Sequence, residues 1–254
     1  MAELTATKPE YGNWVTKKLI FGIVAMSLLF LGLSLLLPIL STVAAFFFLW
    51  SVYFLYARHQ FSPRGGNLQT RIRQLVLDHL DWDGKGKVLD IGCGNGALAI
   101  EIAKQYPQSK VTGIDYWGGI WEYSKEVCEQ NAQTEGVADQ TDFQKASASA
   151  LPYKDEFFDV AVSNFVFHEV SDTRDKRDLV SEALRVVKKG GRFAFQDQFL
   201  EERWYGTIDD LLEAIRSWGI ESVAFTNTSR SDFIPKALKL PFMVGKTGLI
   251  YGEK

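Results

Sequence analysis

The stretch Val88-Leu89-Asp90-Ile91-Gly92-Cys93-Gly94-Asn95-Gly96 decides the fold, because an apolar strand stops there at a glycine cluster that opens a helix. Glycine lets the backbone bend sharply and approach a ligand closely, since no Cβ stands in the way. The pattern therefore predicts a cofactor loop at the end of a buried strand. Its candidate cofactor-binding residues are Asp90, Gly92, Cys93, Gly94, Asn95 and Gly96.

An acid ends the next predicted strand. Asp115 lies 19 residues past Gly96, and an acid there can accept hydrogen bonds from both ribose hydroxyls of an adenosine-containing cofactor. Tyr116 follows directly and is placed to lie against the adenine face.

The glycines alone leave two cofactors open. Gly92, Gly94 and Ala97 also satisfy the dinucleotide pattern G-x-G-x-x-G/A, which is typical of NAD sites. Asp90 favours S-adenosylmethionine (SAM), because its carboxylate would attract the cationic amino group of a methionine tail and repel a pyrophosphate. Gly96 also fits the tighter form G-x-G-x-G.

Several further motifs accompany this loop. They are Leu151-Pro152-Tyr153, Phe158-Asp159-Val160 and Leu184-Arg185-Val186-Val187-Lys188-Lys189-Gly190-Gly191. Together with the glycine loop and Asp115, they make residues 67–254 resemble the class I SAM-dependent methyltransferases, most closely the branch related to ubiquinone, menaquinone and sterol methyltransferases. The resemblance implies a seven-stranded sheet whose last strand is antiparallel, with SAM at the carboxyl ends of the first strands. It also implies that Asp90 and the glycine loop hold the methionine part and that Asp115 holds the ribose.

The sequence departs from that family in two places. Many relatives carry an acid after the third strand, where it touches the adenine amino group. Here Ser147, followed by Ala148, occupies that position, and we expect these two residues to contact the cofactor. The segment 117–121 is also unusual and is expected to shape a cofactor cover or a substrate wall.

Strand and helix patterns alternate beyond residue 66, which is typical of an α/β fold with a mostly parallel sheet and helices on both faces. The predicted strands are 87–91, 110–114, 142–146, 158–164, 192–196, 222–226 and 249–251. The predicted helices are 67–80, 96–105, 120–135, one from an N-cap at Ser171 to a last turn containing Lys188 and Lys189, and 207–218.

Methyl transfer from a sulfonium needs a base only when the acceptor must lose a proton. His168 follows the fourth strand, and we consider it as a base or a substrate contact, because histidine titrates near neutrality. A histidine that bridges loop backbone groups is the alternative. Asn164 and Asp197 end strands four and five, where sites form in such sheets, and Asn164 is a candidate cofactor residue. The Cys93 thiol is expected to be a packed side chain.

Residues 19–57 contain no charged side chain. A single helix of that length would span about 58 Å, nearly twice the roughly 30 Å hydrocarbon core, and Pro38 lies at its midpoint. We therefore predict a transmembrane hairpin of two helices, although a hairpin that only dips into the bilayer, a cleaved signal peptide and a buried core hairpin remain alternatives. Basic residues flank both ends, namely Lys8, Lys17, Lys18, Arg58, Arg64, Arg71 and Arg73, which predicts that both ends and the catalytic domain are cytoplasmic.

The predicted organisation is an N-terminal cytoplasmic segment 1–18, a membrane hairpin 19–57, a linker 58–66 and a SAM-binding domain 67–254. The net charge of −3 argues against a nucleic-acid partner, and the two cysteines offer no metal spacing. The expected partners are the lipid bilayer and a small acceptor, apolar or delivered by the membrane, and the oligomeric state stays open. The apolar stretch 232–243 is expected to be a substrate lid or a membrane-resting patch. A SAM-binding interaction protein without transfer activity and a nicotinamide-dependent reductase are the alternative functions.

Overall fold

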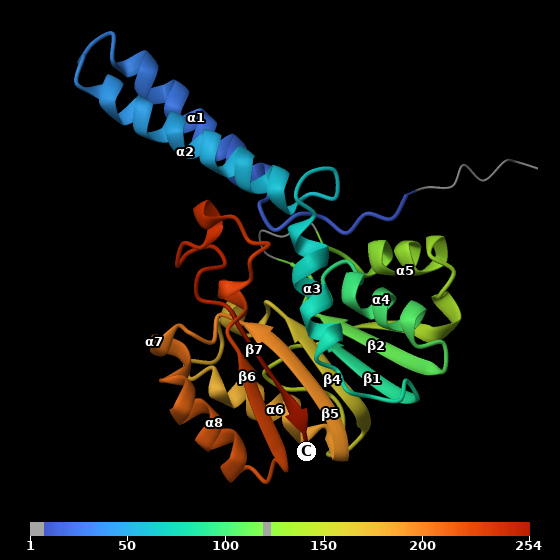
Figure 1. The fold of residues 1–254 in the computed structure, drawn as a ribbon. Coiled ribbons are helices and arrows are strands. Elements are labelled where there is room, and N and C mark those ends of the chain that lie inside the picture. The colour runs from blue at the N-terminus through green and yellow to red at the C-terminus, as the bar shows by residue number, and fades with distance from the viewer. Residues whose placement is uncertain (1–7, 119–122) are drawn as a thin grey trace, which may run out of the picture. The chain divides into compact units, whose positions relative to one another are not determined.

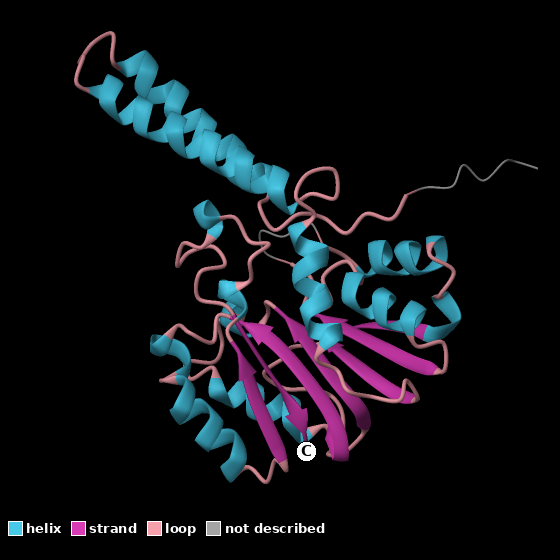
Figure 2. Ribbon diagram, in the orientation of Figure 1, coloured by secondary structure: helices cyan, strands magenta, loops and turns pink. Residues whose placement is uncertain are grey.

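The structure is a computed structural model that describes residues 8–118 and 123–254 (Figures 1 and 2). The chain divides into two compact units. One is Gly12–Ile72, and the other is Arg73–Lys254 together with the segment that ends at Tyr11. The boundary between Ile72 and Arg73 differs from the predicted division at residue 66. It falls inside helix α3 (Leu68–Asp78), so this helix belongs in part to each unit.

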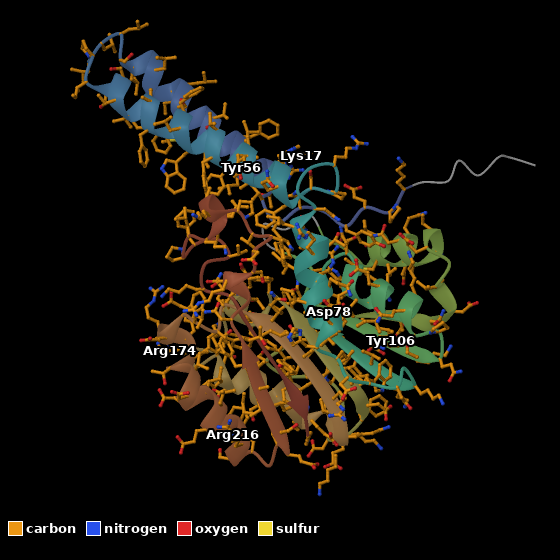
Figure 3. The ribbon with its side chains drawn as sticks, viewed as in Figure 1. Lys17, Tyr56, Asp78, Tyr106, Arg174 and Arg216 are labelled. Carbon is orange, nitrogen blue, oxygen red and sulfur yellow. The ribbon has the colours of Figure 1, made fainter. Side chains whose placement is uncertain are left out.

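The first unit is built around a helical hairpin of α1 (Lys17–Leu33) and α2 (Leu40–Phe61). The two helices pack through their facing sides, where the rings of Phe30 and Phe47 stack 5.7 Å apart and the Ser27 hydroxyl donates to the Ala44 carbonyl at 3.0 Å. Other apolar side chains project outward along the hairpin (Figure 3); Leu28 and Leu49, for example, are 63% and 66% exposed.

The hairpin is longer than the predicted 19–57. Helix α2 includes Arg58–Phe61, which we predicted as the start of a linker, because Arg58 and His59 in its last turn complement the negative end of the helix dipole. Among the described helices only α2, with 22 residues, is long and apolar enough to cross a bilayer. Helix α1 has 17 residues, so two transmembrane helices are not established.

The second unit contains a seven-stranded sheet in the order β3-β2-β1-β4-β5-β7-β6. The strands are β1 (Gly86–Ile91), β2 (Ser109–Asp115), β3 (Thr141–Lys145), β4 (Phe158–Asn164), β5 (Val187–Asp197), β6 (Ser222–Thr226) and β7 (Gly248–Glu253). Only β7 is antiparallel to its two neighbours. The predicted strand count and the antiparallel last strand are confirmed. The strand order reverses between β1 and β4, and ligands bind at such a switch point, outside the carboxyl ends of the strands.

Helices cover both faces of this sheet (Figure 2). They are α4 (Ala97–Gln105), α5 (Lys125–Thr134), α6 (Arg177–Arg185), α7 (Glu202–Tyr205) and α8 (Ile208–Ser217), with short 3-10 turns at Ala138–Gln140, Phe167–Glu169, Thr228–Arg230 and Lys236–Leu238. One apolar core joins the sheet to α6 and α8, and the other joins it to α4 and α5. The start of the predicted helix 120–135 lies partly outside the described residues, and α5 itself begins after an N-cap at Ser124.

The predicted helix after Ser171 is wrong at both ends. Helix α6 begins only at Arg177, because the residues before it form turns around Lys176, whose ammonium donates to the carbonyls of Val170 and Thr173. Lys188 and Lys189 belong to strand β5. The chain leaves the helix early because Phe157 and Phe158 donate their backbone N–H groups to the Val186 carbonyl.

Candidate cofactor and acceptor site

The loop after β1 has the geometry that only glycine adopts without strain. Gly92, Gly94 and Gly96 have φ angles of 71°, 59° and 79°, in the left-handed region. A Cβ on Gly92 would lie 2.1 Å from Cγ2 of Val166, so the loop passes directly against the segment after β4. Gly96 is the N-cap residue of α4. The loop therefore lies at the switch point and presents bare backbone there.

Asp90 is buried beneath this loop, with 1% of its surface exposed. Its Oδ2 accepts a hydrogen bond from the Ala99 N–H at 3.0 Å, in the first turn of α4. Burial raises the pKa of Asp90 to about 7. Helix α4 thus engages one oxygen of the Asp90 carboxylate. The predicted contact with a cationic amino group would use the remaining lone pairs of that carboxylate.

Asp115 ties the end of β2 to the glycine loop. Its Oδ2 accepts from the Gly94 N–H at 2.9 Å, and its Oδ1 accepts from the Trp117 N–H at 2.8 Å. The Trp117 indole donates in turn to the Gly94 carbonyl at 2.9 Å. Burial raises the pKa of Asp115 above its ordinary value. Each oxygen keeps a lone pair for a ribose hydroxyl, so the predicted role fits this geometry.

Tyr116 is 69% exposed beside this acid, and the Lys145 ammonium lies 4.9 Å from its ring centre. An exposed ring at the end of β2 suits the predicted stacking against a base. The segment 117–121, expected to form a cofactor cover or a substrate wall, is described only through Gly118, and the remainder lies outside the described residues.

Two predicted loop residues direct their side chains into protein. The Asn95 amide donates to the Glu10 carbonyl at 3.1 Å and accepts from the Ser124 N–H at 3.2 Å. Cys93 is buried, and burial together with the neighbouring Cys128 raises the pKa of its thiol well above the usual value. A cofactor contact from Asn95 or Cys93 would therefore come from the backbone.

The stretch after β3 forms a hydroxyl cluster. The Ser147 and Ser149 hydroxyls lie 2.8 Å apart, and Ser149 donates to the Asp172 carboxylate at 2.7 Å. Ala148 packs its side chain into the core, which leaves its backbone for any ligand contact. The sequence reasoning missed Asp172, which lies on a separate loop and supplies an acid near the serine that replaces the family's acid.

Asn164 ends β4, opposite Gln196 of β5 in the sheet register. The side-chain oxygens of both residues are buried and accept no hydrogen bond from the described part of the chain. A buried acceptor without a donor is costly, and a cationic amino group would supply donors. Asn164 therefore fits a SAM site, and Gln196 is a neighbour that the sequence reasoning missed.

His168, in the 3-10 turn after β4, forms a close pair with Asp197, the last residue of β5. His168 Nδ1 lies 2.8 Å from Asp197 Oδ1, its Nε2 lies 3.4 Å from Glu169 Oε1, and its ring stacks on Trp204 at 5.9 Å. Burial by itself would lower the pKa of His168, but the carboxylates of Asp197 and Glu169 outweigh burial and raise it to about 10. The alternative of a histidine that only bridges backbone groups does not describe this contact.

Comparison with known proteins indicates a methyltransferase domain. A family described as "Methyltransferase domain" matches residues 89–195, from β1 through most of β5. The chain is 29% identical to the methyltransferase GfsG of Streptomyces halstedii over 180 residues, which cover 70% of this chain and 58% of that protein. It is 31% identical to the ubiquinone/menaquinone biosynthesis C-methyltransferase UbiE of Geotalea daltonii over 121 residues, which cover 47% of this chain and 48% of that protein.

These findings support a class I SAM-dependent methyltransferase domain over residues 89–195. The chain spans about half the length of these curated relatives.

Solved structures agree at the level of the fold. The geranyl diphosphate C-methyltransferase of Streptomyces coelicolor, in complex with S-adenosyl-L-homocysteine, superposes with a TM-score of 0.56 at 15% identity over 75% of this chain and 78% of that chain. The [4+2]-cyclase SpnF superposes with a TM-score of 0.54 at 21% identity over 72% of this chain and 79% of that chain. The match to the methyltransferase family supports SAM as the cofactor. Fold likeness alone does not identify the acceptor.

Proposed function

We propose that this chain is a membrane-anchored methyltransferase that transfers the methyl group of SAM to a small acceptor, apolar or delivered by the membrane. The observation that carries the proposal is the glycine loop at the switch point, with a buried acid beneath it and Asp115 beside it. When bound, SAM supplies an activated methyl group on a sulfonium.

Residues in or at the ends of β1, β2 and β4, around the glycine loop, would hold the cofactor. Asp90 would provide negative charge for the amino group, and the Asn164 oxygen, which accepts no hydrogen bond within residues 8–118 and 123–254, would provide an acceptor. Asp115 would accept from the ribose. Because in-line transfer depends on alignment, holding the reactants in place can contribute about 7 to 11 kcal/mol. The main contribution of the protein to catalysis is therefore to orient the acceptor and the methyl group of SAM.

His168 is proposed to contact the acceptor. A pKa of about 10 keeps the imidazole protonated near neutral pH, so of its two expected roles, substrate contact is favoured over general base. Asp197 fixes the ring through Nδ1, and the Nε2–H faces the half-exposed carboxylate of Glu169 at 3.4 Å, so an acceptor would share or replace that contact. An acceptor with an oxygen lone pair would suit that donor.

The hairpin supports the membrane part of the proposal. Helix α2 would span about 33 Å at 1.5 Å per residue, close to the roughly 30 Å hydrocarbon core. The turn between the helices is apolar, with Leu35 and Leu36 88% and 80% exposed. Exposed apolar surface of this kind favours contact with lipid, and the flanking basic residues favour cytoplasmic ends.

The loop before β7 splits its apolar residues between two environments. Ile234, Leu238 and Val244 are buried, whereas Leu240 and Phe242 are 37% and 53% exposed. Core packing therefore explains only part of the stretch 232–243. We infer that the exposed tip contacts lipid or the acceptor.

Isotope transfer tests the reaction. The full chain, in detergent and supplied with native lipid extract, would receive SAM with a labelled methyl group, and mass spectrometry would identify whatever gains the label. A labelled small apolar compound supports the proposal. Tight SAM binding without any labelled product would favour the alternative, a SAM-binding membrane interaction protein without transfer activity.

A further inference from the structure

Residues that precede the hairpin return to the cofactor loop. The backbone of Glu10 lies against Asn95 of the glycine loop and Asn131 of α5, 85 and 121 positions away in the sequence. All three residues belong to the same compact unit.

The contact is a saturated network of hydrogen bonds. The Glu10 N–H donates to Asn131 Oδ1 at 2.8 Å, and the Glu10 carbonyl accepts from Asn131 Nδ2 at 3.0 Å and from Asn95 Nδ2 at 3.1 Å. Asn131 Nδ2 also donates to the Asn95 main-chain carbonyl at 2.9 Å. Both amide hydrogens of Asn131 are therefore used, one on each partner.

Asn131 is 2% exposed and lies inside a helix. Asparagine is a poor helix former, and burying an amide costs free energy unless it is fully hydrogen-bonded. Helix packing alone would be served better by an apolar residue beside Cys128 and Ala132, its buried neighbours on that face. The hydrogen bonds of Asn131 to the Glu10 and Asn95 main chains therefore explain why a buried amide lies at this position.

Asn131 holds the backbone between two glycines of the cofactor loop. Asn95 lies between Gly94 and Gly96, both with positive φ, and its carbonyl is fixed by Asn131. Because a flexible glycine loop must lose entropy to receive a ligand, a loop fixed beforehand binds its ligand more tightly.

We propose that Asn131 is a positioning residue for the cofactor loop, which acts by joining the main chain of Asn95 to the main chain of Glu10. This inference rests on the proposed binding of SAM at that loop. It makes the main chain of Glu10 a support behind the cofactor loop, while the Glu10 side chain takes no part.

Two substitutions of Glu10 separate this role from any effect of its side chain. Glu10→Pro removes the N–H that Asn131 accepts, whereas Glu10→Ala keeps every main-chain contact. Calorimetry on the full chain in detergent micelles would measure the Kd for SAM. We expect Glu10→Pro to raise it about tenfold, the value of one or two lost hydrogen bonds, and Glu10→Ala to leave it unchanged.

A second pair of variants on α5 controls for folding. Asn131→Asp replaces both donated hydrogens by an acceptor and should raise the Kd at least as much as Glu10→Pro, whereas Gln133→Ala, on the exposed side of the same helix, should have no effect. Hydrogen exchange should quicken at the amides of residues 92–96 in Glu10→Pro and Asn131→Asp, while strands β4 and β5 stay protected. A merely structural defect would quicken exchange in the strands as well.

Equal SAM affinity and equal loop exchange in Glu10→Pro and Glu10→Ala would overturn the inference while leaving the proposed function intact. Failure of the unsubstituted chain to bind SAM would overturn both.

Discussion

His168 Nδ1 lies 2.8 Å from Oδ1 of Asp197, a carboxylate that is completely buried at the end of β5. Burial would raise the pKa of Asp197, but the neighbouring imidazolium outweighs burial and lowers it. The pair is therefore charged over a wide pH range, and each partner keeps the other ionised.

Asp197→Asn should lower the pKa of His168 from about 10 towards its ordinary value of 6.5, because the largest favourable charge is removed. Leaving a buried imidazole without its partner should cost about 3 to 5 kcal/mol of unfolding free energy. NMR titration of His168 and urea denaturation measure the two effects. Glu169→Gln is the control and should shift the pKa less, because Glu169 is half exposed.

The pair also sets the pH range of stability. His168 has a raised pKa, so its contribution is complete below about 6.5 and is lost as pH rises towards 10. Asp197 has a lowered pKa, so its contribution is present above its ordinary value and is lost in acid. Denaturation curves across pH should lose this dependence in Asp197→Asn, and an unchanged profile would contradict the charged pair.

Asp90 should make cofactor affinity depend on pH. With a pKa of about 7 in the free protein, the carboxylate is largely protonated at pH 6 and must ionise to pair with a cationic amino group. SAM affinity should therefore rise up to about tenfold between pH 6 and pH 8. Asp90→Asn keeps an acceptor for Ala99 but should bind SAM weakly at both pH values. A variant as tight as the parent at pH 8 would exclude Asp90 from the site.

The raised pKa of Asp90 also bears on stability without cofactor. An acid that is harder to ionise in the folded state favours folding below its ordinary pKa of 3.8, and this advantage is lost as pH rises towards 7. Asp90→Asn should remove this loss, so the cofactor-free variant should be at least as stable as the parent at pH 8 by thermal denaturation.

Gly92→Ala should destabilise the fold by about 1 to 3 kcal/mol. Its φ of 71° and the 2.1 Å approach to Val166 Cγ2 both oppose a Cβ. Adding Val166→Ala should recover the part of the lost unfolding free energy that comes from the steric clash, but not the part that comes from the positive φ. A double-mutant cycle measures this coupling. Strict additivity of the two substitutions would show that the loop and the β4 segment do not touch.

The hairpin tip tests the membrane topology. Ser34→Cys places a thiol at the end of α1, whereas the two native cysteines are buried. If the hairpin crosses the bilayer, a membrane-impermeant maleimide should label this thiol from outside intact cells. Ser62→Cys, which places a thiol at the C-terminal end of α2, should be labelled only after lysis. Protection of both positions in intact cells would favour a hairpin that dips in and returns.

The sequence was most informative where chemistry and local conformation coincide. The bounds of β4 and β6 match the prediction, and the loop of Gly92, Gly94 and Gly96 adopts the conformation that glycine alone favours. The start of α6 was mispredicted, because Ser171 resembles an N-cap whereas Lys176 organises a turn through contacts that local patterns do not contain.

Contacts between residues that are distant in the chain could not be predicted from the sequence either. His168 meets Asp197 because β4 and β5 are neighbours, an arrangement that follows from strand order and from no spacing in the chain. Asn131 is a clearer case, because its partner Glu10 lies 121 positions away. The sequence analysis did not single out Asn131, and its importance became visible only when the structure showed it buried beside Cys128 and Ala132.

Calorimetry with SAM, its demethylated product and NADH tests the central claim most directly. The full chain in detergent at pH 8 should bind SAM and the demethylated product, and Asp115→Ala, which removes the acceptor that we assign to the ribose, should weaken both. NADH should not bind. Tight binding of NADH with no binding of SAM would contradict the assignment of the loop.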